Sequence, residues 1–248
     1  IGSTSASQRM AFGLAALIAV SALSSLGNAA AHGTLRITTL DVGQGDAILV
    51  EVSGRRMLID GGPDPARLST ELDRVVPAWD RRIDLLVASH PHEDHLAGLP
   101  KLLDRYRVAS VIGAEDRSGG PAAASWRDIL ARSHVAYHQV FTGDQFRIGS
   151  ARVRVLWPDA SYLSLPPGND GRALNDRSIV LRLDVPGFSA LFTGDIESDI
   201  DAHIIRNINA PVDFLKAPHH GSKGAASRAL LAAADPRVSV VSVGTRNS

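Results

Sequence analysis

The stretch LLVASHPHEDHLAGLP, residues 85–100, decides both the fold and the chemistry of this chain. Its apolar first part predicts a buried strand ending at Ala88, and its last part predicts a helix beginning near Asp94. Between the strand and the helix lies a turn with four potential metal ligands: His90, His92, Asp94 and His95.

His90 and His92 stand two residues apart in extended backbone and can face one ion. Asp94 and His95 enter the helix and can face a second ion. Neutral imidazoles and a carboxylate suit zinc, or manganese where the ligands are richer in oxygen. The alternative is a polar turn whose histidines only form hydrogen bonds, but three histidines and one aspartate at this spacing favour the metal site.

Around this turn, short runs of β-branched and aliphatic residues alternate with helical patterns, which predicts an α/β fold. The expected strands are Leu35–Leu40, Ala47–Val52, Arg56–Ile59, Ile83–Ala88, Val108–Ile112, Val153–Trp157, Ser178–Leu183, Ser189–Thr193, Val212–Lys216 and Val238–Val243. The expected helices are 66–76, 94–105, 122–133, 196–206 and 224–234. Residues 159–176 are rich in proline and glycine and predict a long surface loop.

Further candidate ligands follow later strands. Asp195, in LFTGD, comes after the apolar run that ends at Phe192, and His219 and His220, in KAPHHGS, follow the expected strand 212–216. Strand ends are where α/β folds usually gather a site. For Asp195 the alternative is an N-cap of a helix that begins near Ile196.

The composition limits the possible partners. Lys plus Arg and Asp plus Glu are 26 each, so no overall field attracts nucleic acid or an anionic surface. A polyanion must therefore be bound locally. The chain has no cysteine, which excludes disulfides and thiolate metal ligands.

Residues 10–31 form an almost uncharged apolar stretch behind Arg9. Its length suits a membrane-spanning helix, while the small residues 29–31 resemble a signal-peptidase site. A buried core helix is less favoured because the stretch has no polar stripe at helical period. We therefore divide the chain into a hydrophobic membrane segment with its linker, residues 1–33, and a globular domain, residues 34–248.

The order of these motifs carries a family resemblance. A strand ending in LIDGG, then HxHxDH, then a glycine-aspartate after a strand, then a late histidine resembles the metallo-β-lactamase fold over residues 34–248. More narrowly, LDVGQGDAILVE, LLVASHPHEDHLAGLP, NDRSIVLRL, LFTGDIE and LKAPHHGS are similar to motifs of the hydrolase domain of the ComEC competence DNA-internalisation family. This resemblance implies an αββα four-layer sandwich, preceded here by an N-terminal hydrophobic helix, and two divalent ions, zinc or manganese.

The resemblance also implies roles for individual residues. One ion is held by His90 and His92, and the other by three residues, Asp94, His95 and His220. Asp195 bridges the two ions and is expected, with Asp94, to be catalytic. His219 is then free to contact a phosphate or to protonate a leaving oxygen, although the assignment between His219 and His220 stays open.

Further residues are expected to orient the ligands or contact the substrate. Asp60 in LIDGG resembles the aspartate that orients a ligand imidazole. The loop DVGQGD is expected beside the ions, with a simple tight turn as the alternative. The full group is Asp60, Asp41, Gln44, Asp46, Asn175, Asp176, Lys216 and Ser222. Arg172, Arg177, Lys216 and Lys223 are candidate phosphate contacts.

Two features depart from the family pattern. Many metallo-β-lactamase-fold enzymes have a further histidine where this chain has Asn175 and Asp176, so we expect the first ion to be held weakly. ComEC-like chains usually continue beyond the strand 238–243 into a turn with another histidine. We therefore expect the domain to be truncated at its C-terminus.

Three functions remain under comparison. The first is a metal-dependent nuclease that degrades one DNA strand while a membrane channel takes up the other. Its partners are single-stranded DNA, the bacterial cell membrane, and a larger channel polypeptide or the competence machinery, and its hydrolase domain is extracytoplasmic. The second is a secreted or periplasmic phosphodiesterase or esterase that acts on a small or cell-wall phosphoester. The third is a metal-poor structural domain of the DNA channel, which the missing histidine favours.

Overall fold

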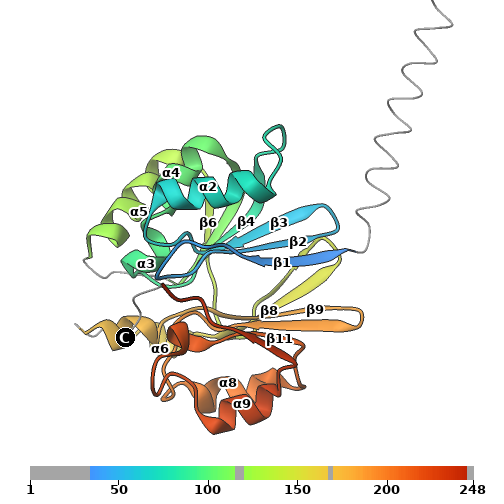
Figure 1. Cartoon of the computed structure of the whole chain (residues 1–248). Helices are drawn as coiled ribbons and strands as arrows, with labels where there is room; N and C mark the ends of the chain where they lie inside the picture. Colours follow the sequence, from blue (N-terminus) through green and yellow to red (C-terminus); the bar gives the residue numbers. More distant parts are fainter. Residues whose placement is uncertain (1–33, 115–119, 167–169, 245–248) are drawn as a thin grey trace, which may run out of the picture.

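Two six-stranded sheets lie face to face and carry helices on their outer sides (Figure 1). The computed structural model describes residues 34–114, 120–166 and 170–244. The predicted membrane segment at residues 10–31 lies outside these ranges. Within them, no helix is both long enough and apolar enough to cross a membrane.

The first sheet is antiparallel from β1 to β3 and parallel from β3 to β6. Its strands, in both chain and spatial order, are β1 (Leu35–Thr39), β2 (Ile48–Val52), β3 (Arg55–Ile59), β4 (Arg82–Ala88), β5 (Arg107–Gly113) and β6 (Ala136–Gln139). Its outer face carries α2 (Pro65–Val75), α3 (Glu93–Leu96), α4 (Leu99–Arg105) and α5 (Pro121–Ser133).

The second sheet is antiparallel from β7 to β10 and parallel from β10 to β12. Its strands are β7 (Gln145–Ile148), β8 (Ala151–Trp157), β9 (Val180–Val185), β10 (Phe188–Phe192), β11 (Phe214–Lys216) and β12 (Val238–Val240). The remaining helices are α6 (Ala160–Leu163), α7 (Gly171–Asn175), α8 (Asp201–Ile208), the short 3₁₀ turn η1 (Pro218–Gly221) and α9 (Arg228–Ala234).

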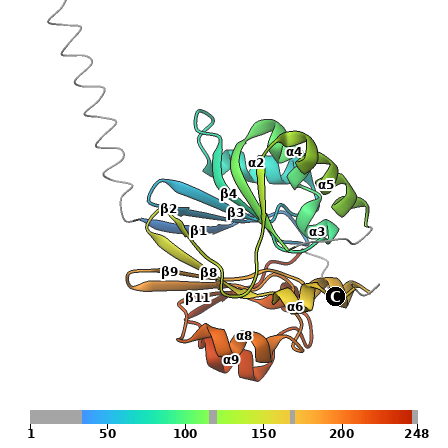
Figure 2. The same cartoon turned by 180° about the vertical axis from the view of Figure 1, so that it is seen from behind.

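Three apolar clusters hold these layers together. One fills the space between the sheets, where Met57 and Val87 of the first sheet meet Leu181 and Phe192 of the second. The other two bury α2, α4 and α5 against the first sheet and α8 and α9 against the second. The view from behind shows the same succession of helix, sheet, sheet and helix (Figure 2). The predicted four-layer αββα sandwich is therefore confirmed.

Most expected elements are present, with local differences. The expected helix 94–105 is two helices, α3 and α4, because the Gly98 N–H donates to the carbonyl oxygen of Gly62 instead of continuing the helical ladder. A side-chain carbon at Gly98 would lie 2.0 Å from the carbonyl oxygen of Gly61. The expected loop 159–176 contains α6 and α7, and the expected helix 196–206 begins only at Asp201. The strand β7 was not expected from the sequence.

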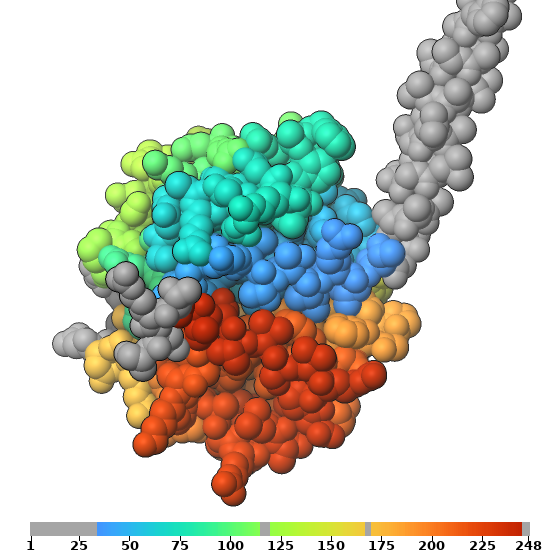
Figure 3. Space-filling model, in the orientation of Figure 1, coloured from blue at the N-terminus to red at the C-terminus, as the bar shows by residue number. Residues whose placement is uncertain are grey.

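The two halves of the sandwich meet along a line across the molecule. In the space-filling view the blue-to-green half, built on the first sheet, rests on the orange-to-red half, built on the second (Figure 3). Because β4 runs toward its carboxyl end at Ala88, the HPHEDH turn that follows lies at one end of this line, near α3 (Figure 1).

Candidate metal centre

Four side chains from both halves converge beyond the end of β4. One potential ligand atom from each of Asp94, His95, Asp195 and His220 lies within 4.8 Å of the others. His95 Nε2 lies 3.1 Å from Asp195 Oδ2, and His220 Nε2 lies 3.1 Å from the same oxygen. His220 Nε2 also lies 3.2 Å from Asp94 Oδ2. We call this group the second position.

Local backbone geometry makes this convergence possible. Asp195 follows β10, and the N-cap of α8 is Ile200, so the alternative of Asp195 as a helix N-cap is wrong. His219 and His220 occupy η1 with φ of 41° and 53°, and Gly221 follows at 73°. Left-handed backbone is rare for residues other than glycine. Here it turns the two imidazoles in different directions, with ring planes 63° apart.

The imidazoles of the second position are held from behind. His95 Nδ1 lies 2.8 Å from Asp60 Oδ2, and His220 Nδ1 lies 2.8 Å from the carbonyl oxygen of Ser242. Both partners accept hydrogen bonds, so each Nδ1 carries the proton and each Nε2 is directed toward the centre. Partners of this kind fix the ring and the tautomer of a metal-binding histidine.

His90 and His92 form the other candidate metal-binding group, which we call the first position. Their ring centroids are 4.9 Å apart, and His90 is 4.1 Å from His95 by the same measure. His90 Nδ1 lies 3.0 Å from Ser89 Oγ, whose own proton goes to Asp60 at 2.6 Å, so His90 Nδ1 donates. His90 Nε2 is buried and has no hydrogen-bond partner among the described residues.

These atoms fit divalent ions. Three imidazoles present their Nε2 atoms unprotonated when neutral, and two carboxylates lie among them. An unpartnered buried nitrogen such as His90 Nε2 is expected where a ligand completes the site. Imidazole with carboxylate suits zinc, and added oxygen ligands suit manganese. The described residues could therefore hold a dinuclear centre.

The charges around the second position also favour a bound cation. Burial disfavours a charged imidazole, but Asp195 and Asp60 outweigh it and raise the pKa of His95. At His220 burial is again outweighed, by hydrogen bonds to Asp195 and Asp94, which raise its pKa to about 9. His90 bonds to a hydroxyl instead, and burial lowers its pKa well below the usual range. The carboxylates thus stabilise positive charge at the second position, which a cation would supply.

Lys216 lies behind this cluster instead of in front of it. It is 1% exposed, and its Nζ forms an ion pair with Asp46 and a second with Asp195 Oδ1 at 3.2 Å. Despite burial, these two carboxylates raise the pKa of Lys216. The expectation that Lys216 contacts phosphate is therefore wrong; the residue holds Asp195 and Asp46 in place.

His219 faces the opening of the site and has its own supporting contacts. Its Nδ1 lies 2.7 Å from Glu197 Oε1 and 3.1 Å from Ser222 Oγ. Asn175 Nδ2 lies 3.4 Å from His219 Nε2. The side chain of His219 is 32% exposed, so it can reach a bound substrate.

The loop DVGQGD is only partly beside the centre. Asp46 is buried, with Oδ1 3.7 Å from His220 Nδ1. Gly45 lets the loop approach, since a side-chain carbon there would lie 2.0 Å from the carbonyl oxygen of Asp94. Asp41, by contrast, is exposed and pairs with Arg67, and Gln44 accepts a hydrogen bond from Gly244.

The remaining expected site residues differ in their surroundings. Asp176 receives hydrogen bonds from the Glu197 backbone and the Trp157 indole, so it braces the fold beside the site. Arg177 is buried and donates to the carbonyl oxygens of Leu163 and Leu165, which excludes it from phosphate contact. Arg172 is exposed and pairs with Asp199, and Lys223 is exposed.

Sequence reasoning missed four supporting residues: Ser89, Ser178, Glu197 and Ser242. Ser178 Oγ accepts a hydrogen bond from the Asp195 backbone, and the others contact His90, His219 and His220 as described. Ser89, Ser178 and Glu197 lie within motifs quoted for the family resemblance, which was the only available signal for them, and Ser242 lies outside those motifs.

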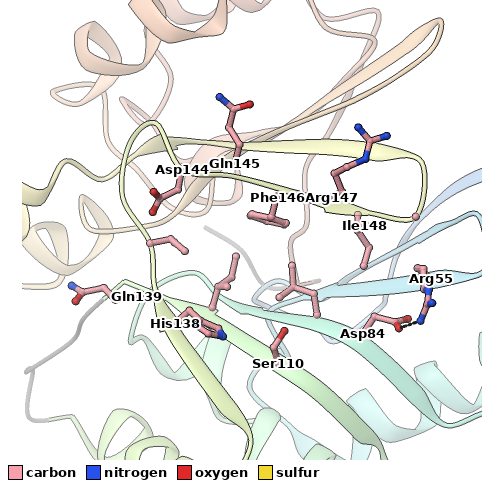
Figure 4. A pocket seen from close by; sticks show the side chains of 14 residues that line it. Arg55, Asp84, Ser110, His138, Gln139, Asp144, Gln145, Phe146, Arg147 and Ile148 are labelled. Carbon is pink, nitrogen blue, oxygen red and sulfur yellow. Dashed lines mark hydrogen bonds and ion pairs between the residues drawn. The ribbon is translucent and has the colours of Figure 1, made fainter.

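Two pockets lie near the sheets. One of about 460 Å³ adjoins His90 and has mostly apolar walls, including Leu96, Trp126 and Tyr137. The other, of about 540 Å³, lies between β6 and β7, where His138 and Gln139 line one side and Phe146 and Ile148 the other, and where Arg55 pairs with Asp84 (Figure 4). No candidate ligand lines this larger pocket, whereas His90 lines the smaller one.

Comparison with known proteins agrees with the fold and the motif order. Residues 40–245 match the model of the family described as the metallo-beta-lactamase superfamily. The chain belongs to this superfamily and is a metallo-β-lactamase-fold hydrolase. Its homologues, described next, place it more narrowly in the ComEC family.

Three curated relatives illustrate this placement. ComE operon protein 3 of Bacillus subtilis is 26% identical over 229 residues, covering 85% of this chain and 28% of that protein. Recombination protein 2 of Haemophilus influenzae is 28% identical over 218 residues, covering 86% and 25%. Competence protein ComA of Neisseria gonorrhoeae is 26% identical over 216 residues, covering 86% and 27%. The chain spans about a quarter of the length of these relatives.

Solved structures share the fold at lower identity. The metallo-beta-lactamase fold protein YhfI from Bacillus subtilis superposes with a TM-score of 0.56 at 13% identity, covering 86% of this chain and 89% of that one. At this identity the likeness concerns the fold alone.

Proposed function

We propose that the domain is a metal-dependent phosphodiesterase that cleaves DNA during competence-related DNA uptake. One observation carries the proposal: His95 and His220 each donate a hydrogen bond from Nδ1 to an acceptor behind them and direct Nε2 toward Asp195, while His90 Nε2 is buried without a partner among the described residues. In this proposal His90 and His92 hold one ion, and Asp94, His95 and His220 hold the other. Asp195 lies between the two.

When bound, a pair of divalent ions stabilises charge on an attacked phosphoryl group and activates water near neutral pH. The chain's own residues supply the rest. Lys216 pairs with the Asp195 carboxylate, and the Ser178 hydroxyl accepts a hydrogen bond from the Asp195 backbone N–H. Glu197 orients His219, whose exposed ring is placed to give a proton to the leaving oxygen.

The choice of DNA rests on the relatives and on the pocket beside His90. Relatives named for competence and recombination favour a nucleic-acid substrate. An apolar, aromatic-lined pocket next to the ions suits a flat nucleobase beside the scissile phosphate better than a purely polar cell-wall phosphoester. We further propose that residues 10–31 attach the domain to the bacterial membrane, with the domain extracytoplasmic.

The test uses the full chain loaded with Mn²⁺ or Zn²⁺. Single-stranded DNA and a small chromogenic phosphodiester are offered separately, with Asp94→Ala beside the wild type. Glu93→Ala, an exposed neighbour on the same helix, is the matched control. We expect metal-dependent DNA cleavage that Asp94→Ala abolishes and Glu93→Ala retains.

Other outcomes would select other functions. Hydrolysis of the small diester with intact DNA would replace the nuclease with a phosphodiesterase of small substrates. Absence of bound metal in the wild type would leave a structural role for the domain.

A further inference from the structure

Three buried polar atoms near the metal centre lack a hydrogen-bond partner among the described residues: Asp46 Oδ1, His90 Nε2 and Asn175 Oδ1. Asp46 Oδ1 lies beside the second position, 3.7 Å from His220 Nδ1. His90 and Asn175 are both 3% exposed, so neither His90 Nε2 nor Asn175 Oδ1 can be satisfied from bulk water. A buried oxygen left without a hydrogen bond is destabilising, and two such atoms in one region suggest a shared partner.

The helix α7 carries Asn175 and begins beside His92 of the first position. At its start, a side-chain carbon at Gly171 would lie 3.6 Å from His92 Cε1 and 3.8 Å from its Nε2. At its end, Asn175 contacts His219. The helix therefore runs from the ring of His92 to the ring of His219.

The hydrogen bonds of His219 decide which amide atom is free. His219 Nδ1 donates to the Glu197 carboxylate at 2.7 Å. Asn175 Nδ2 faces the same ring, 3.5 Å from Nδ1 and 3.4 Å from Nε2. The amide nitrogen is thus engaged, and the lone pairs of Asn175 Oδ1 remain for another ligand.

We infer that Asn175 Oδ1 is a third protein ligand of the first position, together with His90 Nε2 and His92. This inference rests on the proposed metal-dependent function. It assigns a donor to the place where related enzymes carry a histidine and this chain has none. It also gives His90 Nε2 and Asn175 Oδ1 one partner, the cation.

An amide oxygen changes what the first position binds. It is neutral and harder than imidazole, and such oxygens suit manganese or magnesium better than zinc. The second position has two carboxylates among its ligands. We therefore expect one tightly held ion and one exchangeable ion, the exchangeable one being preferably Mn²⁺.

The test counts ions and is independent of DNA cleavage. Wild-type full chain is titrated with Mn²⁺ and, separately, Zn²⁺ by calorimetry, and the pair of bound Mn²⁺ ions is followed by electron paramagnetic resonance. Asn175→Leu, similar in size but without a donor, should keep the tight ion and weaken the other by about tenfold or more. The coupled Mn²⁺ signal should disappear at concentrations that fill the wild type.

Two further variants guard against simple unfolding. Asn175→Asp should retain both ions and tighten the weaker one, because it adds negative charge, and Asn175→His should shift the weaker position toward Zn²⁺. Asn207→Leu on α8, whose amide donates only to a backbone carbonyl, is the matched control and should bind as the wild type.

Several results would overturn the inference. If the Asn175→Leu variant is folded and binds both ions with wild-type affinity, Asn175 is not a ligand. The same conclusion follows if His219→Ala, and not Asn175→Leu, loses the weaker ion. A wild type that binds one ion would refute the first position but leave one-ion hydrolysis open. A wild type that binds none would refute the proposed function as well.

Discussion

The imidazoles of His95 and His220 each have a hydrogen-bond acceptor behind them and a carboxylate in front, whereas His90 has a hydroxyl behind it and its Nε2 is left without a partner among the described residues. The second position is braced by Asp60, by the Ser242 carbonyl and, through Asp195, by Lys216. The first position has Ser89 behind one imidazole and an unpartnered amide oxygen nearby. The difference teaches that the hydrogen bonds behind the ligands, as much as the identity of the ligands, determine whether an ion is held tightly or exchanges.

The strongest way to break this contrast is Asp195→Ala, since Asp195 touches both His95 and His220 and is proposed to serve both ions. We expect metal content close to zero and DNA cleavage reduced by roughly 10³-fold. Elemental analysis and single-turnover kinetics measure the two effects. Asp199→Ala, an exposed carboxylate that pairs with Arg172, is the control. Full metal content in Asp195→Ala would remove Asp195 from the ligands.

Titration with a chelator should reveal the difference in affinity between the two positions without any substitution. With rising chelator, one ion should leave first with a small change in melting temperature, and the second should leave later with a larger one. A ligand present at a hundred times its Kd stabilises the native state by about 2.7 kcal/mol. Most of the stabilisation by metal should therefore come from the tightly held ion. Calorimetry beside metal analysis follows both steps. Loss of both ions in one step would contradict unequal positions.

Asp60→Asn should reduce the difference in affinity between the two positions by weakening the second position. Asparagine tolerates the left-handed backbone of Asp60, where φ is 60°, but its amide no longer offers His95 a carboxylate. The tight ion should weaken by about 10–100-fold while the weak ion changes little. Metal titration measures the affinity of each ion separately. Asp104→Asn, an exposed site on α4, should behave as the wild type.

The smallest effect is expected from Glu197→Gln, which should leave both ions in place. Glu197 supports His219, not the second position, so we expect kcat to fall by about tenfold or more with unchanged metal content. Steady-state kinetics beside metal analysis is the measurement, and Glu71→Gln on α2 is the control. A loss of metal would show that His219 serves as a ligand.

Local sequence patterns predicted the parts of this molecule that depend on local spacing. The HPHEDH turn lies between a strand and a helix as expected, and the late strand ends bring Asp195 and His220 to it. The role of Lys216 was not predictable, because its partner Asp46 lies 170 positions earlier and joins it only through the packing of the two sheets. The break at Gly98 likewise depends on the carbonyl of Gly62, which accepts the Gly98 N–H and which no helical pattern records.

The turn that carries His219 and His220 has a consequence for how this protein would respond to selection. Each non-glycine residue in left-handed backbone destabilises the native state by about 1–3 kcal/mol, and two stand there in succession. Glycine at His219, which is not among the proposed ligands, would relax the backbone and raise the melting temperature while deleting its imidazole. Screening a variant library for heat resistance alone should therefore enrich inactive proteins at this turn, an instance of stability and activity pulling in opposite directions.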